Sequence, residues 1–193
     1  MQQIDFYQNY CRKMNEAVQK INLEKLCLMS DCLWGALQSK RQVFLCGNGG
    51  SAANAIHIAN DFLYGVSKSS HTAIRVHALT ANQSILTCLA NDISYDEIFS
   101  YQLEALTQKD DILIALSGSG NSPNIIKAIQ TAQLIGMKTF AILGYDGGRC
   151  LAIAEESIHV PINDMQISED MQLVVGHMIM QWFRQRLLSK SGS

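Results

Sequence analysis

The sequence carries little net charge and contains no long hydrophobic run. Its 193 residues include 15 Lys and Arg against 17 Asp and Glu, which leaves a formal charge of −2. This balance offers no electrostatic basis for a nucleic-acid or anionic-membrane partner. No apolar stretch approaches the roughly 18–20 residues of a membrane span, and no charged-then-apolar leader opens the chain. With 48% hydrophobic residues, we expect one cytoplasmic domain over residues 1–193 with a sizeable core.

Paired cysteine motifs are also absent. No two cysteines form a CxxC pair, and several lie inside apolar runs, where a free thiol behaves as a small hydrophobic side chain. Disulfide frameworks belong to smaller secreted chains. We therefore predict reduced, structural thiols at Cys11, Cys27, Cys32, Cys46, Cys88 and Cys150.

The common nucleotide-binding fingerprints are missing. No segment matches the Walker A pattern GxxxxGK[ST], and Gly47, Gly49 and Gly50 have the wrong spacing for GxGxxG. No acidic residue stands at a convincing strand end about 20 residues further on. A nucleotide-binding oxidoreductase is therefore the least favoured function.

Glycine is instead concentrated where two apolar runs end. The first such segment, residues 43–61, reads VFLCGNGGSAANAIHIAND. Residues 43–46 are short enough for one buried strand, residues 47–51 form a glycine-rich turn, and alanines from Ala52 onward open a helix. The N-terminus of a helix presents free N–H groups and a partial positive charge, so this turn suits a phosphate group.

The second segment follows the unbroken apolar run at 112–116, which is typical of a central parallel strand. Residues 117–123 read SGSGNSP. We expect Ser122 at the N-cap of a helix and Pro123 at its first position. Hydroxyls without a lysine suit a monoester phosphate held by neutral donors, and two such turns in one small domain suggest a sugar phosphate. An ordinary strand-to-helix loop is the alternative for each turn.

Helical and strand patterns alternate along the chain. This alternation predicts an α/β fold in which a doubly wound parallel sheet is flanked by helices and binds ligands at the carboxyl ends of its strands. Residues 1–40 are expected to form N-terminal helices for packing or oligomerisation, and residues 41–188 the α/β core. Two helices are expected within 1–40, with Asn22 as the cap of the second, and further helices at 52–61, 83–90, 95–103, 124–135, 149–154 and 169–188. The expected strands are 43–46, 74–79, 112–116, 138–143 and 157–160. A loop is expected at 65–70.

A few titratable residues form a second candidate site. His57 and Asp61 lie four residues apart and so share a helix face. His177 lies in an otherwise apolar helix, where a histidine needs a partner. Glu169 precedes His177 by about 12 Å along that helix, so both can reach one metal only if Glu169 lies at or before the helix start. These groups could form a four-ligand zinc site or, equally, an acid–base pair without metal. The remaining histidines are expected to be structural or surface residues: His71, His77 and His159.

With these residues in view, the sequence resembles a known family. The segments GNGGSAANAIHIAND and SGSGNSPNI, the pair Asn91 and Asp92, and the final helix with Gly176 and His177 resemble the sugar isomerase (SIS) domain. Within that domain the sequence is most similar to the phosphoheptose isomerase family, and the resemblance covers nearly the whole chain. It implies the SIS fold, conversion of sedoheptulose 7-phosphate into D-glycero-D-manno-heptose 7-phosphate, and a homotetramer with sites shared between subunits.

The resemblance also implies a role for each matching residue. Asp61 takes the place of a catalytic glutamate, and His177 that of the catalytic histidine. In zinc-bearing members the ligand positions, for one Zn²⁺ per subunit, match His57, Asp61, Glu169 and His177. The residues implied to bind the phosphate or the sugar are Asn48, Gly49, Ser51, Asn91, Asp92, Ser117, Gly118, Ser119, Ser122 and Glu169.

Two positions depart from the family pattern. The family's glutamate is one methylene shorter here, as Asp61, and a family glutamine is replaced by Glu169. A second carboxylate should strengthen the binding of a divalent cation. These changes leave the expected fold intact and bear on the exact substrate.

Two functions follow from the resemblance. The first is an aldose–ketose isomerase in which Asp61 and His177 move a proton between C1 and C2 through an enediol, with any Zn²⁺ polarising the oxygens. The second is a non-catalytic SIS module that senses a sugar phosphate or binds a replication initiator. Relatives of the second kind tend to lose the acid–base residues, so the presence of Asp61 and His177 favours the enzyme.

Overall fold

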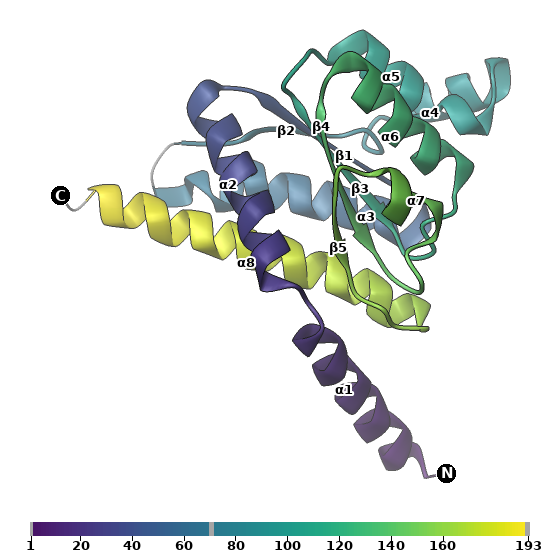
Figure 1. Ribbon diagram of the computed structural model, residues 1–193, viewed down its shortest axis with the longest axis vertical. Coiled ribbons are helices and arrows are strands. Elements are labelled where there is room, and N and C mark those ends of the chain that lie inside the picture. The colour runs from purple at the N-terminus through teal and green to yellow at the C-terminus, as the bar shows by residue number, and fades with distance from the viewer. Residues whose placement is uncertain (1, 70–71, 192–193) are drawn as a thin grey trace.

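A parallel sheet forms the centre of the protein (Figure 1). The computed structural model describes residues 2–69 and 72–191. Its five strands lie in the order β2-β1-β3-β4-β5, and every neighbouring pair is parallel. The winding direction reverses between β1 and β3, and such a reversal opens a crevice at the carboxyl ends of the two strands. The strands are β1 (Gln42–Gly47), β2 (Arg75–Ala78), β3 (Ile112–Ser117), β4 (Lys138–Leu143) and β5 (Glu156–His159).

Helices cover both faces of the sheet, as Figure 1 shows. Alternate strand residues face opposite ways, so Val43 and Leu45 pack with one helical layer while Phe44 and Cys46 pack with the other. The doubly wound parallel sheet expected from the sequence is thereby confirmed. The first layer contains α1 (Gln3–Gln19), α2 (Leu23–Ser39), α3 (Gly49–Asn60) and α8 (Met165–Ser191), and the second contains α4 (Gln83–Asp92), α5 (Ser100–Leu106), α6 (Pro123–Ile135) and α7 (Gly148–Ile153).

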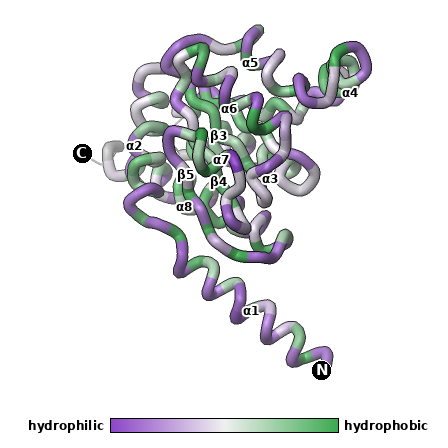
Figure 2. The backbone as a smooth tube through the Cα atoms, turned by 45° about the vertical axis from the view of Figure 1, so that its right-hand side comes forward, coloured by the Kyte–Doolittle hydropathy of each residue, from purple (hydrophilic) through white to green (hydrophobic). Residues whose placement is uncertain are grey.

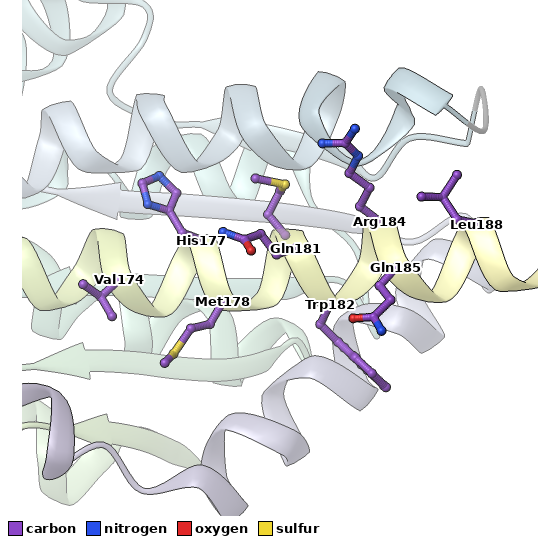
Figure 3. Close-up of a pocket in the computed structure, with 9 residues that line it drawn as sticks. Val174, His177, Met178, Gln181, Trp182, Arg184, Gln185 and Leu188 are labelled. Atoms are coloured by element: carbon purple, nitrogen blue, oxygen red, sulfur yellow. The ribbon is translucent and has the colours of Figure 1, made fainter.

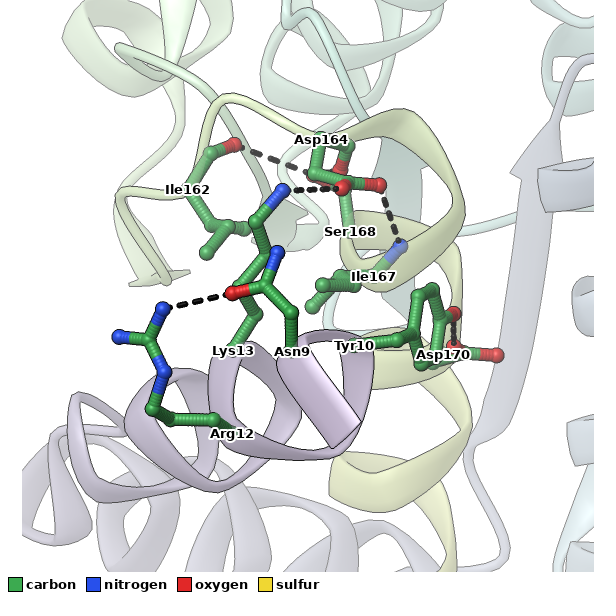
Figure 4. Close-up of polar contacts among 9 residues, drawn as sticks. All are labelled: Asn9, Tyr10, Arg12, Lys13, Ile162, Asp164, Ile167, Ser168 and Asp170. Atoms are coloured by element: carbon green, nitrogen blue, oxygen red, sulfur yellow. Dashed lines mark hydrogen bonds and ion pairs between the residues drawn. The ribbon is translucent and has the colours of Figure 1, made fainter. Parts of the chain in front are cut away.

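Helix α1 projects from the body of the molecule, and its outer part alternates between polar and apolar residues (Figures 1 and 2). Its inner part is held against the start of α8 (Figure 4). The hydroxyl of Tyr10 donates to Oδ2 of Asp170 at 2.6 Å, and Nζ of Lys13 lies 3.3 Å from Oδ2 of Asp164. Donation to this carboxylate, together with burial, raises the pKa of Tyr10 to about 12.

Helix α3 differs from the expectation at both ends. It begins at Gly49, inside the segment expected to be a turn. At its other end the chain continues into a π-helical turn, Asp61–Gly65, which the N–H of Val66 closes by donating to the C=O of Asp61 at 3.0 Å. The loop expected at 65–70 is replaced by the end of this turn and a 3-10 helix, Ser67–Ser69, while residue 70 lies outside the described residues.

Helix α8 begins at Met165, four residues before its expected start. Asp164 explains the difference, because its side chain accepts from the N–H of Ile167 at 3.4 Å and its C=O accepts from the N–H of Ser168 at 2.9 Å. This is the geometry of a helix N-cap. Elsewhere, the helix expected over 95–103 is divided into a 3-10 turn, Tyr95–Glu97, and α5.

All six cysteines are free thiols. Burial raises the pKa of Cys46, and it raises that of Cys150 to about 11, so both behave as packing residues. Among the described residues, no helix combines the length and the apolar character needed to cross a membrane.

Candidate active site

The two glycine-rich segments meet in one cleft at the carboxyl ends of β1 and β3. The cleft has a volume of about 260 Å³, and the N-termini of α3 and α6 both contribute to its walls. Two helix N-termini that share one space favour an anionic ligand. Eight of the ten residues predicted to bind substrate lie here, since its lining consists of Asn48, Gly49, Ser51, Leu116, Ser117, Gly118, Ser119, Ser122, Met165 and Glu169.

The serine hydroxyls of the cleft are arranged to donate. Oγ of Ser51 accepts from Nε2 of Gln172 at 2.9 Å, while Ser117 and Ser119 accept from backbone N–H groups of their own turn at 3.0 and 3.3 Å. Because each oxygen already accepts a hydrogen bond, its proton remains free for a ligand. Ser122 occupies the N-cap position of α6 as predicted, but its side chain makes no capping hydrogen bond.

A pair of amides connects the two turns. Asn48 and Asn124 donate to each other's Oδ1 at 2.8 Å in both directions, and the hydroxyl of Tyr95 donates to Oδ1 of Asn48 at 3.0 Å. Asn124 is buried and Asn48 is half-buried, and this reciprocal pair fixes the spacing of the two helix starts. Neither Asn124 nor Tyr95 was predicted from the sequence.

Helices α3 and α8 run side by side in the same direction (Figures 1 and 3). Gly50 meets Glu169 near the start of the pair, Ile58 meets Gly176 further along, and Gly65 meets Met180 beyond that. A Cβ on Gly176 would lie 2.8 Å from Cγ1 of Ile58, so the glycine permits this close approach. The helix pair therefore connects the cleft to a second group of side chains.

That second group consists of His57, Asp61 and His177. Nε2 of His57 lies 2.9 Å from Nε2 of His177, and Oδ2 of Asp61 lies 3.6 and 3.4 Å from these two nitrogens. All three ligand atoms could hold one metal ion. Tetrahedral zinc with bonds of about 2.0–2.1 Å keeps its ligand atoms about 3.3 Å apart, so the triangle fits the ion. The side chains are 49%, 18% and 41% exposed, which leaves a fourth position open to water or substrate.

Glu169 does not belong to this group. The sequence argument allowed it to share a metal with His177 only from a position at or before the helix start, but the capped α8 places it in the second turn. The two residues are therefore about 12 Å apart along the axis. Its carboxylate lies instead on the first turn of α3, where a Cβ on Gly50 would overlap both oxygens.

Comparison with known proteins identifies the family. A family model described as the SIS domain matches residues 6–144. The chain belongs to the SIS domain family.

Individual SIS relatives agree with this assignment. The chain is 36% identical over 174 residues to a phosphoheptose isomerase of Chlorobaculum parvum, covering 89% of this chain and 83% of the relative. It is 37% identical over 170 residues to a probable phosphoheptose isomerase of Thermoplasma acidophilum, covering 88% of this chain and 93% of the relative. The structure of a phosphoheptose isomerase from Neisseria gonorrhoeae matches with a TM-score of 0.87 at 27% identity, covering 95% of this chain and 100% of that one.

Asn91 and Asp92 are not among the lining residues of the cleft of this SIS domain. They end α4 and are exposed, and Nδ2 of Asn91 donates to Oδ1 of Asp92 at 2.8 Å. This bond, together with one from the thiol of Cys88, lowers the pKa of Asp92. Nearby Tyr95 extends to the cleft residue Asn48, whereas the predicted pair does not line the cleft.

The other described histidines have structural partners. His77 stacks on Phe44 and hydrogen-bonds through Nε2 to Oε1 of Gln42 at 3.1 Å. Nε2 of His159 lies 3.0 Å from the C=O of Tyr145. His71 lies outside the described residues.

Proposed function

We propose that this SIS chain is an aldose–ketose isomerase that converts sedoheptulose 7-phosphate into D-glycero-D-manno-heptose 7-phosphate through an enediol. The observation that carries the proposal is the convergence of His57, Asp61 and His177 on the same helix pair whose start forms the anion cleft. The names of the SIS relatives, which are phosphoheptose isomerases, support the reaction and the substrate.

The cleft is the proposed phosphate site. Ser51, Ser117, Ser119 and Ser122 offer hydroxyl donors, and the backbone of the two helix starts offers N–H groups. Hydrogen bonds to a charged acceptor contribute about 1.5–3 kcal/mol each, so neutral donors can hold a phosphate without a lysine.

The distance between the two sites along the helix pair favours a substrate with a long carbon chain. Gly50 precedes His57 by about 10 Å of helix, and Glu169 precedes His177 by about 12 Å. An extended heptose 7-phosphate has about eight bonds between phosphorus and C1, and at about 1.2 Å of advance per bond it spans about 10 Å. A triose phosphate would span about half of that, too little to connect the two sites.

The proton transfer is assigned to Asp61 and His177. Oδ2 of Asp61 faces both histidines, which leaves Oδ1 free to carry the proton between C1 and C2. Without a metal, Nε2 of His177 would move the proton between the two oxygens of the enediol. Zn²⁺, one per subunit, would be held by His57, Asp61 and His177 and would polarise those oxygens.

Exposed apolar side chains support assembly into a homotetramer. Ile4, Phe6 and Tyr7 of α1 are 65%, 56% and 56% exposed. Along α8, Trp182 and Met178 point away from the side on which His177 and Arg184 lie (Figure 3). Light scattering after size-exclusion chromatography tests the tetramer. We place the protein in the cytoplasm, where phosphorylated sugars are metabolised.

Turnover of sedoheptulose 7-phosphate by the purified protein tests the proposal. We expect aldose product, about one zinc per chain by metal analysis, and loss of activity after chelation that added zinc reverses. A protein that binds the ester but never isomerises it would overturn the enzymatic assignment and favour the non-catalytic SIS module.

A further inference from the structure

The turn Tyr95–Glu97, which follows α4, contacts both helices whose starts form the cleft. The hydroxyl of Tyr95 donates to Oδ1 of Asn48, the N-cap residue of α3, at 3.0 Å. Nζ of Lys127, in the second turn of α6, pairs with Oε1 of Glu97. A segment outside the two glycine-rich motifs therefore joins the two helix starts.

These contacts complete a closed ring of side chains. Asn48 and Asn124 form the reciprocal amide pair described above. Lys127 follows Asn124 by three residues, so both lie on the same face of α6. Glu97 and Tyr95 belong to one turn, and Tyr95 returns to Asn48. Because the ring closes, moving any one of its members displaces its neighbours.

The ring determines which atom of Asn48 the cleft meets. Its Oδ1 accepts from Nδ2 of Asn124 at 2.8 Å and from the hydroxyl of Tyr95 at 3.0 Å, and a carbonyl oxygen has two acceptor sites. Its Nδ2 uses one N–H on Asn124 and carries a second. Asn48 lines the cleft, so the group that it offers to a ligand is an N–H donor. A donor suits the oxygens of a phosphate ester, whereas an amide oxygen in the same place would repel them.

The hydroxyl of Tyr95 selects this orientation of the amide. The pair of Asn48 and Asn124 would be equally well bonded if both side chains turned over, because each amide carries a donor and an acceptor. A phenol donates a hydrogen bond more strongly than it accepts one. Tyr95 therefore favours the arrangement that places Oδ1 of Asn48 opposite its hydroxyl.

The ion pair keeps Tyr95 within reach of Asn48. Glu97 also accepts from Oγ of Ser100 at 2.5 Å, and its side chain is only 25% exposed. The bonds from Lys127 and Ser100 lower the pKa of Glu97, so the carboxylate stays ionised and paired at neutral pH. The turn that carries Tyr95 is thereby fixed to α6.

We propose that Tyr95 is a positioning residue that turns the amide nitrogen of Asn48 toward the cleft, and that the ion pair of Glu97 and Lys127 holds Tyr95 for this role. The expected consequence is tighter binding of phosphate esters, with no part in the proton transfer. The inference deepens the proposed sugar-phosphate function and rests on it.

Removal of one hydroxyl tests the role of Tyr95. In Tyr95→Phe, the dissociation constant of sedoheptulose 7-phosphate measured by calorimetry should rise about fivefold, as the loss of one hydrogen bond implies, while kcat stays within about twofold of wild type. The side-chain amide resonances of Asn48 should shift in the NMR spectrum of this variant before any ligand is added. Tyr101→Phe, at an exposed position of α5, is the matched control and should change none of these.

A change at Glu97 separates two explanations by the sign of the effect. Removing a negative charge near an anion site should by itself tighten binding. If Glu97 acts by holding Tyr95, Glu97→Gln should instead weaken binding of the ester about threefold. The double variant Tyr95→Phe/Glu97→Gln should then bind no more weakly than Tyr95→Phe alone. Lys127→Arg keeps the ion pair and should bind as wild type does, and Glu104→Gln, an exposed acid of α5, is the charge control and should not weaken binding.

Unchanged affinity for the ester in Tyr95→Phe, or unchanged resonances of Asn48, would overturn the inference. Tighter binding in Glu97→Gln, or losses that multiply in the double variant, would overturn the role of the ion pair. A wild-type chain that binds no ester would instead defeat the proposed function. The resonances of Asn48 need no ligand and would still decide whether Tyr95 orients the amide.

Discussion

The two ends of the α3 and α8 pair differ in chemistry although the same helices build both. At the cleft, Ser51 and Ser117 are almost fully buried, and the ligand-facing groups other than Glu169 are neutral. At the histidine cluster, His57 and His177 keep 49% and 41% of their side chains exposed, and every member can ionise.

This difference suggests that the cleft binds the ligand and that the histidine cluster carries out the chemistry. Fixed neutral donors bind an anion without changing their own protonation. An acid–base or metal site needs groups that exchange protons and a position that substrate can enter. We therefore expect changes at the cleft to act on KM and changes at the cluster to act on kcat.

The largest expected effect is at the cluster. His177→Gln and Asp61→Asn each remove a proton-transfer group and a metal ligand, so kcat for sedoheptulose 7-phosphate should fall about 10³-fold. KM should stay within threefold of wild type, because the phosphate cleft is intact. Steady-state kinetics measure both values, and a mutant that keeps its kcat would defeat the assigned roles.

The next effect is at the cleft. The double variant Ser119→Ala/Ser122→Ala removes two hydroxyl donors to the phosphate, each contributing about 1.5–3 kcal/mol. KM should rise at least about 100-fold, with kcat within threefold. Ser67→Ala is the control, because that hydroxyl donates to the C=O of Tyr64 and does not line the cleft. A fall in kcat with constant KM would show that the cleft takes part in the chemistry.

A smaller effect is expected between the two sites. Gly176→Ala forces a methyl group against Ile58, and such overpacking costs about 1–3 kcal/mol of unfolding free energy. The displaced His177 should lower kcat by about tenfold. Urea unfolding of Gly176→Ala, Ile58→Ala and the double variant should give a favourable coupling of about 1 kcal/mol. Strict additivity would mean that the two helices do not meet there.

The smallest effect is expected far from both sites. Tyr10→Phe removes the hydrogen bond to Asp170 and should cost about 1 kcal/mol of stability, since the bond is partly exposed. The pKa of Tyr10 is about 12 in the folded protein against an ordinary value of 10.0, so the hydrogen bond should stabilise the protein at neutral pH and lose this effect at high pH. The stabilisation is complete below pH 10 and disappears as the pH rises through 12. Denaturant titrations at pH 8 and above pH 11 check this, and kcat should be unchanged.

Local signals made both halves of the candidate site predictable. The glycine-rich turns follow apolar strands directly, and parallel strands end on one edge of a sheet, so their meeting followed from the order of elements. His57 and Asp61 are one helical turn apart. The fold could also be predicted from local patterns of apolar residues, and Asn22 was recognised as the cap of α2 from its place just before such a pattern.

Contacts between distant segments could not be read in this way. The pairing of Asn48 with Asn124 joins residues 76 positions apart, and that of Ser51 with Gln172 joins residues 121 apart. The place of Glu169 depended on where α8 begins, and the capping role of Asp164 was not recognised. The metal role of Glu169 was implied by the family resemblance, whereas its expected substrate role agrees with its place in the cleft lining.

The π-helical turn after α3 has a consequence for variation in this segment. A wide turn accommodates one more residue than an α-helical turn, so removing one residue between Asp61 and Gly65 would let the helix continue regularly. Because the wide turn itself absorbs the additional residue, the side chains beyond such a deletion would keep nearly the same direction around the axis. Phe62 and Val66 are buried, and both could stay on the packed face if the residue removed lay between them. The segment should therefore tolerate the loss of one exposed residue, Leu63 or Tyr64, better than a polar exchange at either buried position.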